Sequence, residues 1–426
     1  MEIAQLHQLY LDCNSVCTDT RKLENGNMFF ALKGENFNGN TYAEHALEKG
    51  AKYAVVDEEA YDSSDKTILV DDVLKTLQKL ATHHRNYLKA PIIALTGSNG
   101  KTTTKELINA VLSQNYKTTA TLGNLNNHIG VPLTLLSMTS ATEIGIVEMG
   151  ANHQKEIEFL CKIAYPDYGL ITNYGKAHLE GFGGIDGVIK GKSEMFLHLA
   201  EHDKTIFLNN NDLIQIEKSQ GAKTITFGNP ESQPEIVIDF LGAQPFVVSK
   251  YKETIINSQL IGDYNFTNIA IAIAIGDFFK VDSAKIKSAI ESYIPSNNRS
   301  QIIEKGTYKI ILDAYNANPT SMRAALLNFE KQEGHKIAIL GDMFELGEDA
   351  EYEHQTIAEL ANSMAIDNIF LVGENFNQSK INSKKTIQFN SFEDFKEAFS
   401  DSTFEDSLIL IKGSRGMALE RVLELL

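Results

Sequence analysis

The residues best suited to chemistry lie in one glycine-rich loop, Thr96-Gly97-Ser98-Asn99-Gly100-Lys101-Thr102. Its two glycines let backbone N–H groups converge on phosphate oxygens, and the helix expected after them adds a favourable dipole. Lys101 would reach the β- and γ-phosphates, and the Thr102 hydroxyl would ligate Mg²⁺. Leu95 stands where the longer eight-residue pattern has glycine, so the loop has the short Gly-x-x-Gly-Lys-Thr form. The loop predicts binding of a nucleoside triphosphate, against the alternative of an ordinary turn between a strand and a helix.

Three residues farther along the chain could complete a metal site. Glu148 ends the apolar run 144–147, where a carboxylate would face the phosphate loop at the carboxyl edge of a parallel sheet. It is either a second Mg²⁺ ligand or a surface glutamate at a strand end. His178 follows the strand expected at 169–172, and Lys192 lies in the next expected helix. From the residues alone, both could equally be solvated side chains.

Alternating strands and helices are expected to position these residues. The apolar run Ile92 to Leu95 precedes the loop, and a helix with apolar residues on one side follows it. The same alternation recurs to about Leu208, which predicts a mainly parallel, helix-covered sheet and an α/β fold. Shorter β-like runs then lead to Ile261, and an apolar helix from 265 to 279 closes this unit.

The chain is expected to form three α/β units, because one hydrophobic core seldom organises 426 residues. A small unit over residues 1–90 ends where a helix-like segment stops before Pro91. The central phosphate-loop unit would span 91–295, and the polar stretch 295–298 would be a hinge. Renewed alternation predicts a third, Rossmann-like unit over 296–426, with strands near 310–312, 336–340, 369–372 and 408–411.

The balance of charges excludes several classes of function. Lys and Arg number 39 against 56 Asp and Glu, for a net charge of −17, which argues against a general nucleic-acid binder or a binder of anionic membranes. The N-terminus lacks a basic region followed by an apolar run, and no stretch reaches the roughly 18–20 apolar residues of a membrane span. We therefore expect a cytoplasmic protein without nucleic-acid partners or membrane insertion. Cys13, Cys17 and Cys161 are expected to be free thiols, because they have no paired metal-ligand spacing.

The motifs together resemble those of the Mur ligases over nearly the whole chain. The strings that carry the resemblance are the phosphate loop extended to Thr103, 124–132, 148–153, 178–182, 313–319, 341–347 and 412–416. Within the family, the chain resembles the branch whose substrates are a UDP-N-acetylmuramoyl tripeptide and D-alanyl-D-alanine. The resemblance implies an ATP-dependent amide ligase of peptidoglycan synthesis that activates the tripeptide carboxylate as an acyl phosphate. A monomer is expected, although the sequence itself leaves the oligomeric state open, as it does the choice between lysine and diaminopimelate in the tripeptide.

For ATP, the resemblance implies contacts from the loop residues 97–103 and from three residues beyond it. Asn268, near Asn265, would bond adenine, Asp313 would bond the ribose hydroxyls, and Arg299 would reach the γ-phosphate when the domains close. Helix capping is the alternative for both asparagines, and without the family Arg299 is merely an exposed hinge residue.

The same resemblance implies two magnesium ions held by Thr102, Glu148, His178 and Lys192. Lys192 would be carbamylated, because an N-carboxylated lysine is an anion that can ligate Mg²⁺ whereas an ammonium would repel it. Lys190 is the nearby competitor. The residues expected to take part in catalysis are Lys101, His178, Lys192 and Arg299.

The substrate contacts are implied in the first and last units and in the string 124–132. Thr20, Asn36 and Phe37 would bind the UDP end, although the family often has Asp-Gly-His where this chain has Asn38-Gly39-Asn40, and a pure turn role is the alternative. The remaining candidates for substrate binding are Asn126, Asn127, Tyr315, Asn316, Asn318, Lys412 and Arg415.

Two other functions compete with this interpretation. The sister ligase that adds the third amino acid typically carries Asp-Asn-Pro-Arg in its last domain, and no such string occurs here. A nucleotide switch without ligase activity would have no reason to combine Glu148, His178, Lys192 and Asp313.

Overall fold

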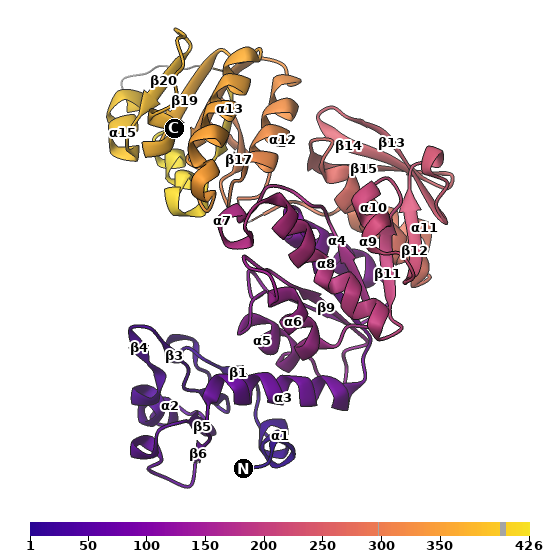
Figure 1. Ribbon diagram of the computed structural model, residues 1–426, viewed down its shortest axis with the longest axis vertical. Helices are drawn as coiled ribbons and strands as arrows, with labels where there is room; N and C mark the ends of the chain where they lie inside the picture. Colours follow the sequence, from indigo (N-terminus) through magenta and orange to yellow (C-terminus); the bar gives the residue numbers. More distant parts are fainter. Residues whose placement is uncertain (297, 401–405) are drawn as a thin grey trace.

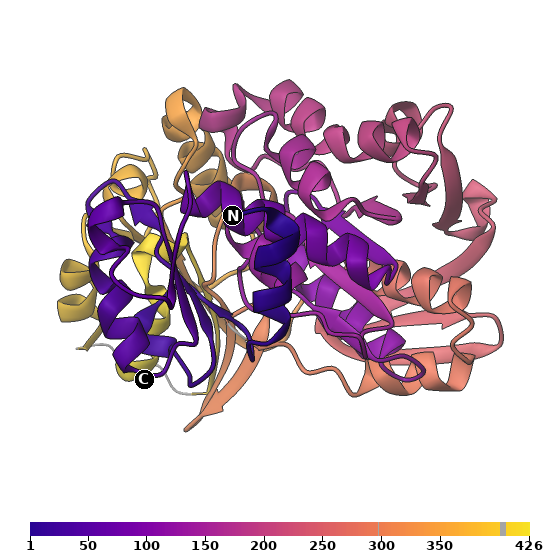
Figure 2. The same cartoon turned by 90° about the horizontal axis from the view of Figure 1, so that it is seen from below.

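Three parallel-rich sheets follow one another along the chain in the computed structural model, which describes residues 1–296, 298–400 and 406–426 (Figure 1). Asn297, in the stretch predicted as a hinge, lies outside the described residues. The first and third sheets lie at opposite ends of the long axis and on the same side of the second, as the two views agree (Figures 1 and 2). Among the described residues, no helix combines the length and apolar composition needed to cross a membrane.

The first sheet is small and entirely parallel, in the order β1-β2-β5-β6. Its strands are β1 (Val16–Cys17), β2 (Met28–Phe30), β5 (Tyr53–Val56) and β6 (Thr67–Leu69). A two-stranded hairpin, β3 (Lys33–Gly34) and β4 (Phe37–Asn38), projects beside it. The accompanying helices are α1 (Ile3–Leu11), α2 (Ala43–Glu48) and α3 (Val73–Leu88).

The central sheet has the order β15-β14-β13-β12-β11-β10-β7-β9-β8, and only the pairings β13–β14 and β14–β15 are antiparallel. Its strands are β7 (Ile92–Thr96), β8 (Thr118–Ala120), β9 (Ile144–Glu148), β10 (Tyr168–Ile171), β11 (Thr205–Asn209), β12 (Lys223–Gly228), β13 (Ile236–Ala243), β14 (Phe246–Tyr251) and β15 (Thr254–Ile261). Its helices are α4 (Lys101–Leu112), α5 (Gly130–Leu136), α6 (Glu156–Ala164), α7 (Leu179–Phe182), α8 (Ile185–Glu201), α9 (Leu213–Lys218), α10 (Asn265–Phe278) and α11 (Ser283–Glu291).

Alternation along β7 explains why both faces of this sheet are covered. Ile92 and Ala94 pack in one core with α5, α6 and α8, while Ile93 and Leu95 pack in another with α4 and α10. Because all five residues of β7 are buried, its carboxyl end is a fixed platform for the loop that follows.

The third sheet has the order β16-β17-β21-β18-β19-β20, and only the pairing β16–β17 is antiparallel. Its strands are β16 (Gln301–Lys305), β17 (Tyr308–Asp313), β18 (His335–Gly341), β19 (Asn368–Val372), β20 (Thr386–Phe389) and β21 (Ser407–Lys412). Its helices are α12 (Pro319–Glu330), α13 (Ala350–Ser363), α14 (Glu374–Asn377) and α15 (Phe392–Ser400). The α/β class and the mainly parallel central sheet are confirmed. In the central and third sheets, strands β8, β16 and β20 were not predicted.

Helix α3 joins the first sheet to the central one. Its residues Leu77 and Leu80 share a single core with Met28 of β2, Val131 of α5 and Ile157 of α6. Polar bonds reinforce this junction: Thr82 donates to the carbonyl of Ile163, and Arg85 forms an ion pair with Asp167 at 2.7 Å. Consequently α3 packs against both units. Where one unit ends and the next begins stays a prediction.

Candidate active site

The glycine-rich loop turns sharply between β7 and α4, and two of its glycines are required by geometry. Gly97 has φ +142°, and a Cβ there would lie 2.0 Å from Thr172 Oγ1. Gly100 has φ +80°, and a Cβ there would lie 2.5 Å from Asn268 Oδ1. Both the left-handed backbone and the close neighbours exclude other residues, so the loop can present its N–H groups only with glycine at these positions.

Asn173, two residues after the end of β10, holds this loop in place. Its carbonyl and side-chain oxygens accept from the backbone N–H groups of Ser98 and Asn99, both at 3.1 Å. Its side-chain amide donates to the Asn99 carbonyl at 3.0 Å. Sequence reasoning missed this residue, although its position after a strand at the same sheet edge was an available signal.

Lys101 folds back over the loop, where its Nζ donates to the Gly97 carbonyl at 2.6 Å. Burial lowers the pKa of Lys101, while the charge of Glu148 opposes this shift and that of Arg299 adds to it. An anion bound here would stabilise the charged ammonium.

The carboxylate of Glu148 accepts hydrogen bonds from two of the predicted site residues. Thr102 Oγ1 donates to its Oε2 at 3.0 Å, and Asn126 Nδ2 donates to its Oε1 at 2.8 Å. Among the described residues, no three His, Cys, Asp or Glu side chains gather as a ligand set. A hydroxyl beside one carboxylate nevertheless fits Mg²⁺ at a phosphate site, since this ion keeps several waters and takes few protein ligands.

Lys192 is buried, with an exposed fraction of 1%, next to the site formed by Thr102 and Glu148. Its Nζ donates to the carbonyl of Ala151 at 2.9 Å and sits 4.9 Å from the centre of the Phe182 ring. Burial, and secondarily the charge of Lys101, set its pKa well below the ordinary lysine value. Lys190, the competing candidate, is exposed.

His178 contacts the third unit. Its Nδ1 lies 2.6 Å from Oε2 of Glu345, and the histidine lowers the pKa of that carboxyl. The backbone carbonyl of Glu345 also accepts from the N–H of Glu180. Glu345 lies within the string 341–347 but was not singled out from the sequence, because its contact joins two units.

Asn265 and Asn268 form a buried chain under the loop. Thr104 Oγ1 donates to Asn268 Oδ1 at 3.0 Å, Asn268 Nδ2 donates to Asn265 Oδ1 at 2.8 Å, and Asn265 Nδ2 donates to the Ile261 carbonyl. The helix-capping alternative is therefore wrong for both, since α10 has no side-chain cap.

The third unit brings an aromatic and several charges to the same region. The guanidinium of Arg299 lies 3.5 Å from the centre of the Tyr315 ring, and that of Arg415 lies 4.9 Å from it. Lys412 Nζ pairs with Asp313 Oδ2 at 2.5 Å, while Asp313 Oδ1 accepts from the Ser300 N–H at 3.0 Å. The predicted ribose-binding and dipeptide-binding residues thus neutralise each other in this arrangement.

Direct bonds join the central unit to the third unit. Asn318 Nδ2 donates to Asn99 Oδ1 at 2.7 Å, and Thr320 Oγ1 accepts from the Lys176 N–H at 2.9 Å. Lys176 also pairs with Glu353 of α13 at 2.5 Å.

One cavity of about 530 Å³ lies between the central and third units and gathers most of the predicted residues. Those that line it are Ser98, Asn99, Gly100, Lys101, Thr102, Thr103, Asn126, Asn127, Glu148, His178, Asn268, Arg299, Asp313, Tyr315, Asn316, Asn318 and Lys412. Lys192 lies behind Ala151, which does line the cavity, and Arg415 lies behind Tyr315.

Three predicted residues lie apart from this cavity, in the first unit. Thr20 begins the 3₁₀ turn Thr20–Lys22, and Asn36 and Phe37 lie at the tip of the β3–β4 hairpin. Phe37 is 50% exposed and stacks on Tyr42 with ring centres 5.4 Å apart.

Comparison with known proteins gives matches along nearly the whole chain. The Mur ligase middle domain matches residues 95–276, the Mur ligase glutamate ligase domain matches 298–415, and the Mur ligase family catalytic domain matches 13–85. The UDP-N-acetylmuramoyl-tripeptide–D-alanyl-D-alanine ligase of Bacillus subtilis is 34% identical, covering 96% of this chain and 92% of the relative. The Escherichia coli ligase of the same name is 33% identical, covering 97% and 93%.

Solved structures of similar proteins support the same family relationship. A crystal structure of MurF from Acinetobacter baumannii superposes with a TM-score of 0.87 at 29% identity, covering 99% of this chain and 97% of the other. MurF ligase from Thermotoga maritima, in complex with ADP, gives 0.84 at 27% identity, covering 98% and 97%. With domain matches in all three units and full-length relatives above 30% identity, this chain belongs to the Mur ligase family.

Proposed function

We propose that this protein is an ATP-dependent ligase that joins D-alanyl-D-alanine to a UDP-N-acetylmuramoyl tripeptide in peptidoglycan precursor synthesis. The observation that carries the proposal is the cavity whose wall combines the phosphate loop and Glu148 with Arg299, Asp313 and Asn318 of the third unit. A nucleotide switch would need only the loop. Relatives that carry this name and share 30–34% identity over nearly the full length support the same function.

In the first step, a terminal carboxylate oxygen of the tripeptide attacks the γ-phosphorus of ATP, and ADP leaves. Lys101 and Arg299 would offset the negative charge on the transferring phosphoryl group. Thr102, Glu148 and His178 would hold magnesium, which would supply positive charge to offset the negative charge of the phosphate oxygens.

In the second step, the amine of the dipeptide attacks the acyl carbon, phosphate leaves and one proton is released. Activation is needed because a free carboxylate resists nucleophiles. Asn316, Asn318, Lys412 and Arg415 would orient the dipeptide from the third unit. Lys412 could do so only after separating from Asp313, which binding of the ribose hydroxyls by Asp313 would favour.

The UDP end would bind on the first unit, at Thr20 and at the exposed hairpin tip with Asn36 and Phe37. The three units would then each serve one substrate: residues 1–90 the UDP-linked tripeptide, 91–295 ATP and 296–426 the dipeptide. Asn126 and Asn127 would line the path of the tripeptide. A monomer is part of the proposal. A reaction that consumes ATP and a UDP-linked precursor would take place in the cytoplasm.

Carbamylation of Lys192 is part of the proposal. The side chain is buried, forms no ion pair within the described residues and lies beside the carbonyl of Ala151. Such surroundings disfavour an ammonium, whereas an N-carboxylate could face the magnesium site proposed at Thr102 and Glu148.

Phosphate release tests the function directly. The protein would be incubated with UDP-N-acetylmuramoyl tripeptide, ATP and magnesium, with and without D-alanyl-D-alanine. Release that requires both the tripeptide and the dipeptide is expected. Release that does not respond to the dipeptide would exclude this ligase activity. Release with UDP-N-acetylmuramoyl dipeptide and a free amino acid, but not with the tripeptide and D-alanyl-D-alanine, would point to the sister ligase.

A further inference from the structure

The β3–β4 hairpin of the first unit is too short to hold its own shape. Each strand has two residues, and even longer isolated hairpins are marginal in water. Phe37, the first residue of β4, is nevertheless exposed and stacks on Tyr42, which ends the 3₁₀ turn after the hairpin. Something outside the hairpin must therefore fix its position.

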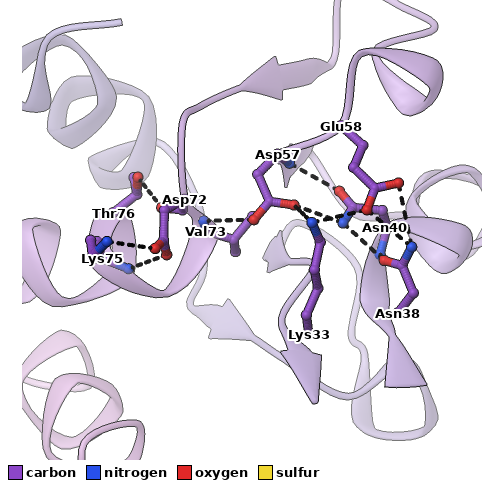
Figure 3. Close-up of polar contacts among 9 residues, drawn as sticks. All are labelled: Lys33, Asn38, Asn40, Asp57, Glu58, Asp72, Val73, Lys75 and Thr76. Carbon is purple, nitrogen blue, oxygen red and sulfur yellow. Dashed lines mark hydrogen bonds and ion pairs between the residues drawn. The ribbon is translucent and has the colours of Figure 1, made fainter. Parts of the chain in front are cut away.

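Asp57, at the end of β5, provides that anchor (Figure 3). Its Oδ1 accepts from Lys33 Nζ at 2.9 Å and from Asn40 Nδ2 at 2.8 Å, on the two sides of the hairpin. Its Oδ2 accepts from the N–H of Val73, the first residue of α3, at 3.2 Å. Its own N–H donates to Asn40 Oδ1 at 2.9 Å. One carboxylate thus ties both ends of the hairpin to the start of a helix.

Glu58 gives a second, more exposed set of contacts to the same hairpin. It pairs with Lys33 at 2.9 Å and accepts from Asn38 Nδ2 at 3.2 Å. These bonds do not reach α3, so the link from the hairpin to the helix depends on Asp57 (Figure 3).

Helix α3 continues this link to the wall of the cavity. Gln78 Nε2 donates to the carbonyl of His128 at 3.0 Å, and Thr82 donates to that of Ile163. His128 itself lines the cavity. The hairpin tip and the cavity are therefore held at a fixed separation through Asp57 and α3.

We propose that Asp57 is a positioning residue that sets the affinity for the UDP-linked substrate. It would do so by holding the hairpin so that Phe37 and the cavity engage opposite ends of the same substrate. This inference rests on the proposed function, in which the hairpin contacts the UDP end.

Asp57→Asn is a sharp test because it changes no volume. Whichever way the new amide turns, its NH₂ faces a donor: either Lys33 and Asn40, or the N–H of Val73. Asp72→Asn is the matched control. Asp72 caps the same helix through the Lys75 N–H at 2.9 Å, and asparagine caps as well as aspartate, so the control loses the same charge without releasing the hairpin.

The measurement is steady-state kinetics of the full chain with each substrate varied, with calorimetric titration of UDP-N-acetylmuramoyl tripeptide. Asp57→Asn is expected to raise the KM and Kd for that substrate roughly 5- to 30-fold, as the loss of one or two charge-assisted bonds implies. The kcat and the KM for ATP and for D-alanyl-D-alanine should stay within about twofold of wild type. Phe37→Ala should raise the same KM, and the double variant should be little worse than Phe37→Ala alone, because both act through the hairpin.

Three results would overturn the inference: an Asp57→Asn variant that matches Asp72→Asn in KM, one that lowers only the thermal midpoint, and effects of Asp57→Asn and Phe37→Ala that multiply in full. Lys33→Met gives a second variant that leaves Val73 and Asn40 bonded, and it should raise the same KM to a smaller extent. A wild-type protein that does not turn over the UDP-linked tripeptide would instead refute the proposed function itself.

Discussion

Mild acid should weaken the junction between α1, α3 and the central unit, because two buried histidines there must stay neutral. His7 Nε2 lies 3.0 Å from His84 Nδ1, and His84 Nε2 lies 2.9 Å from the carbonyl of Met138. A carbonyl only accepts, so His84 carries its proton on Nε2 and accepts at Nδ1 from the Nε2–H of His7. A proton added to His84 Nδ1 would face that N–H.

Burial, followed by the charges of His84 and His83, lowers the pKa of His7 to about 4. The unfolded chain titrates near 6.5 and binds the extra proton first, so stability is constant above that pH and falls as the pH drops toward 4. At about pH 5 the linkage relation gives a loss of about 2 kcal/mol from His7, which solvent screening reduces to roughly 1–2 kcal/mol. For a unit of this size, that corresponds to a fall of roughly 2–8 °C in the thermal midpoint.

The assay is thermal unfolding at about pH 7.5 and pH 5, followed by circular dichroism, for the wild type and for His7→Gln. Glutamine can put its amide nitrogen where Nε2 lies and keep the bond to His84, but it does not titrate. Titration of the groups that the two proteins share cancels in the difference. The wild type should lose more stability on acidification than His7→Gln, by the amount given above. Equal losses in the two proteins would refute the reasoning, as would a variant that is more sensitive to acid than the wild type.

Three further outcomes follow from the site. Lys192→Ala should abolish ligase turnover, and added short carboxylates should restore part of it. Wild-type activity should fall on removal of CO₂ and return with bicarbonate. An alanine variant as active as the wild type would exclude carbamylation. Glu148→Gln should raise the magnesium concentration for half-maximal rate roughly tenfold or more, and an unchanged requirement in a magnesium titration would remove Glu148 from the metal site. Asn318→Ala should be less stable than Asn318→Ser by roughly 1 kcal/mol in thermal melts, because serine keeps the cap of α12; equal melts would show that the cap does not contribute.

Local chemistry predicted much of the fold. The buried run before the phosphate loop became β7, and the helix that stops before Pro91 became α3, capped by Asp72 as its composition favours. Strand β16 was missed because it lies at a sheet edge, where none of its residues is buried and the apolar signal is weak. Strand β8 was missed for the same reason, since its three residues are only half-buried.

The choice between Lys192 and Lys190 shows what a pattern can and cannot decide. Val188, Lys192, Met195 and Leu199 are spaced four, three and four residues apart, so Lys192 lies on the apolar face of α8. That face is buried, which the sequence could have indicated. The contacts of Asn173 and Glu345 could not be predicted this way, because each depends on where another element ends in space.

The charges of the cavity explain why a chain of net charge −17 binds a polyanion at this place. Lys412 is already neutralised by Asp313, whereas Arg299 forms no ion pair within the described residues and its Nε has no hydrogen-bond partner there. The positive charge of Arg299 contributes to the lowered pKa of Lys101, so the two cations repel each other across the cavity between the central and third units. A triphosphate between them would remove this repulsion and add attraction to both sides. Nucleotide binding should therefore pull the two units together. The bond between Asn318 and Asn99 lies at the contact between them, where this closure would act.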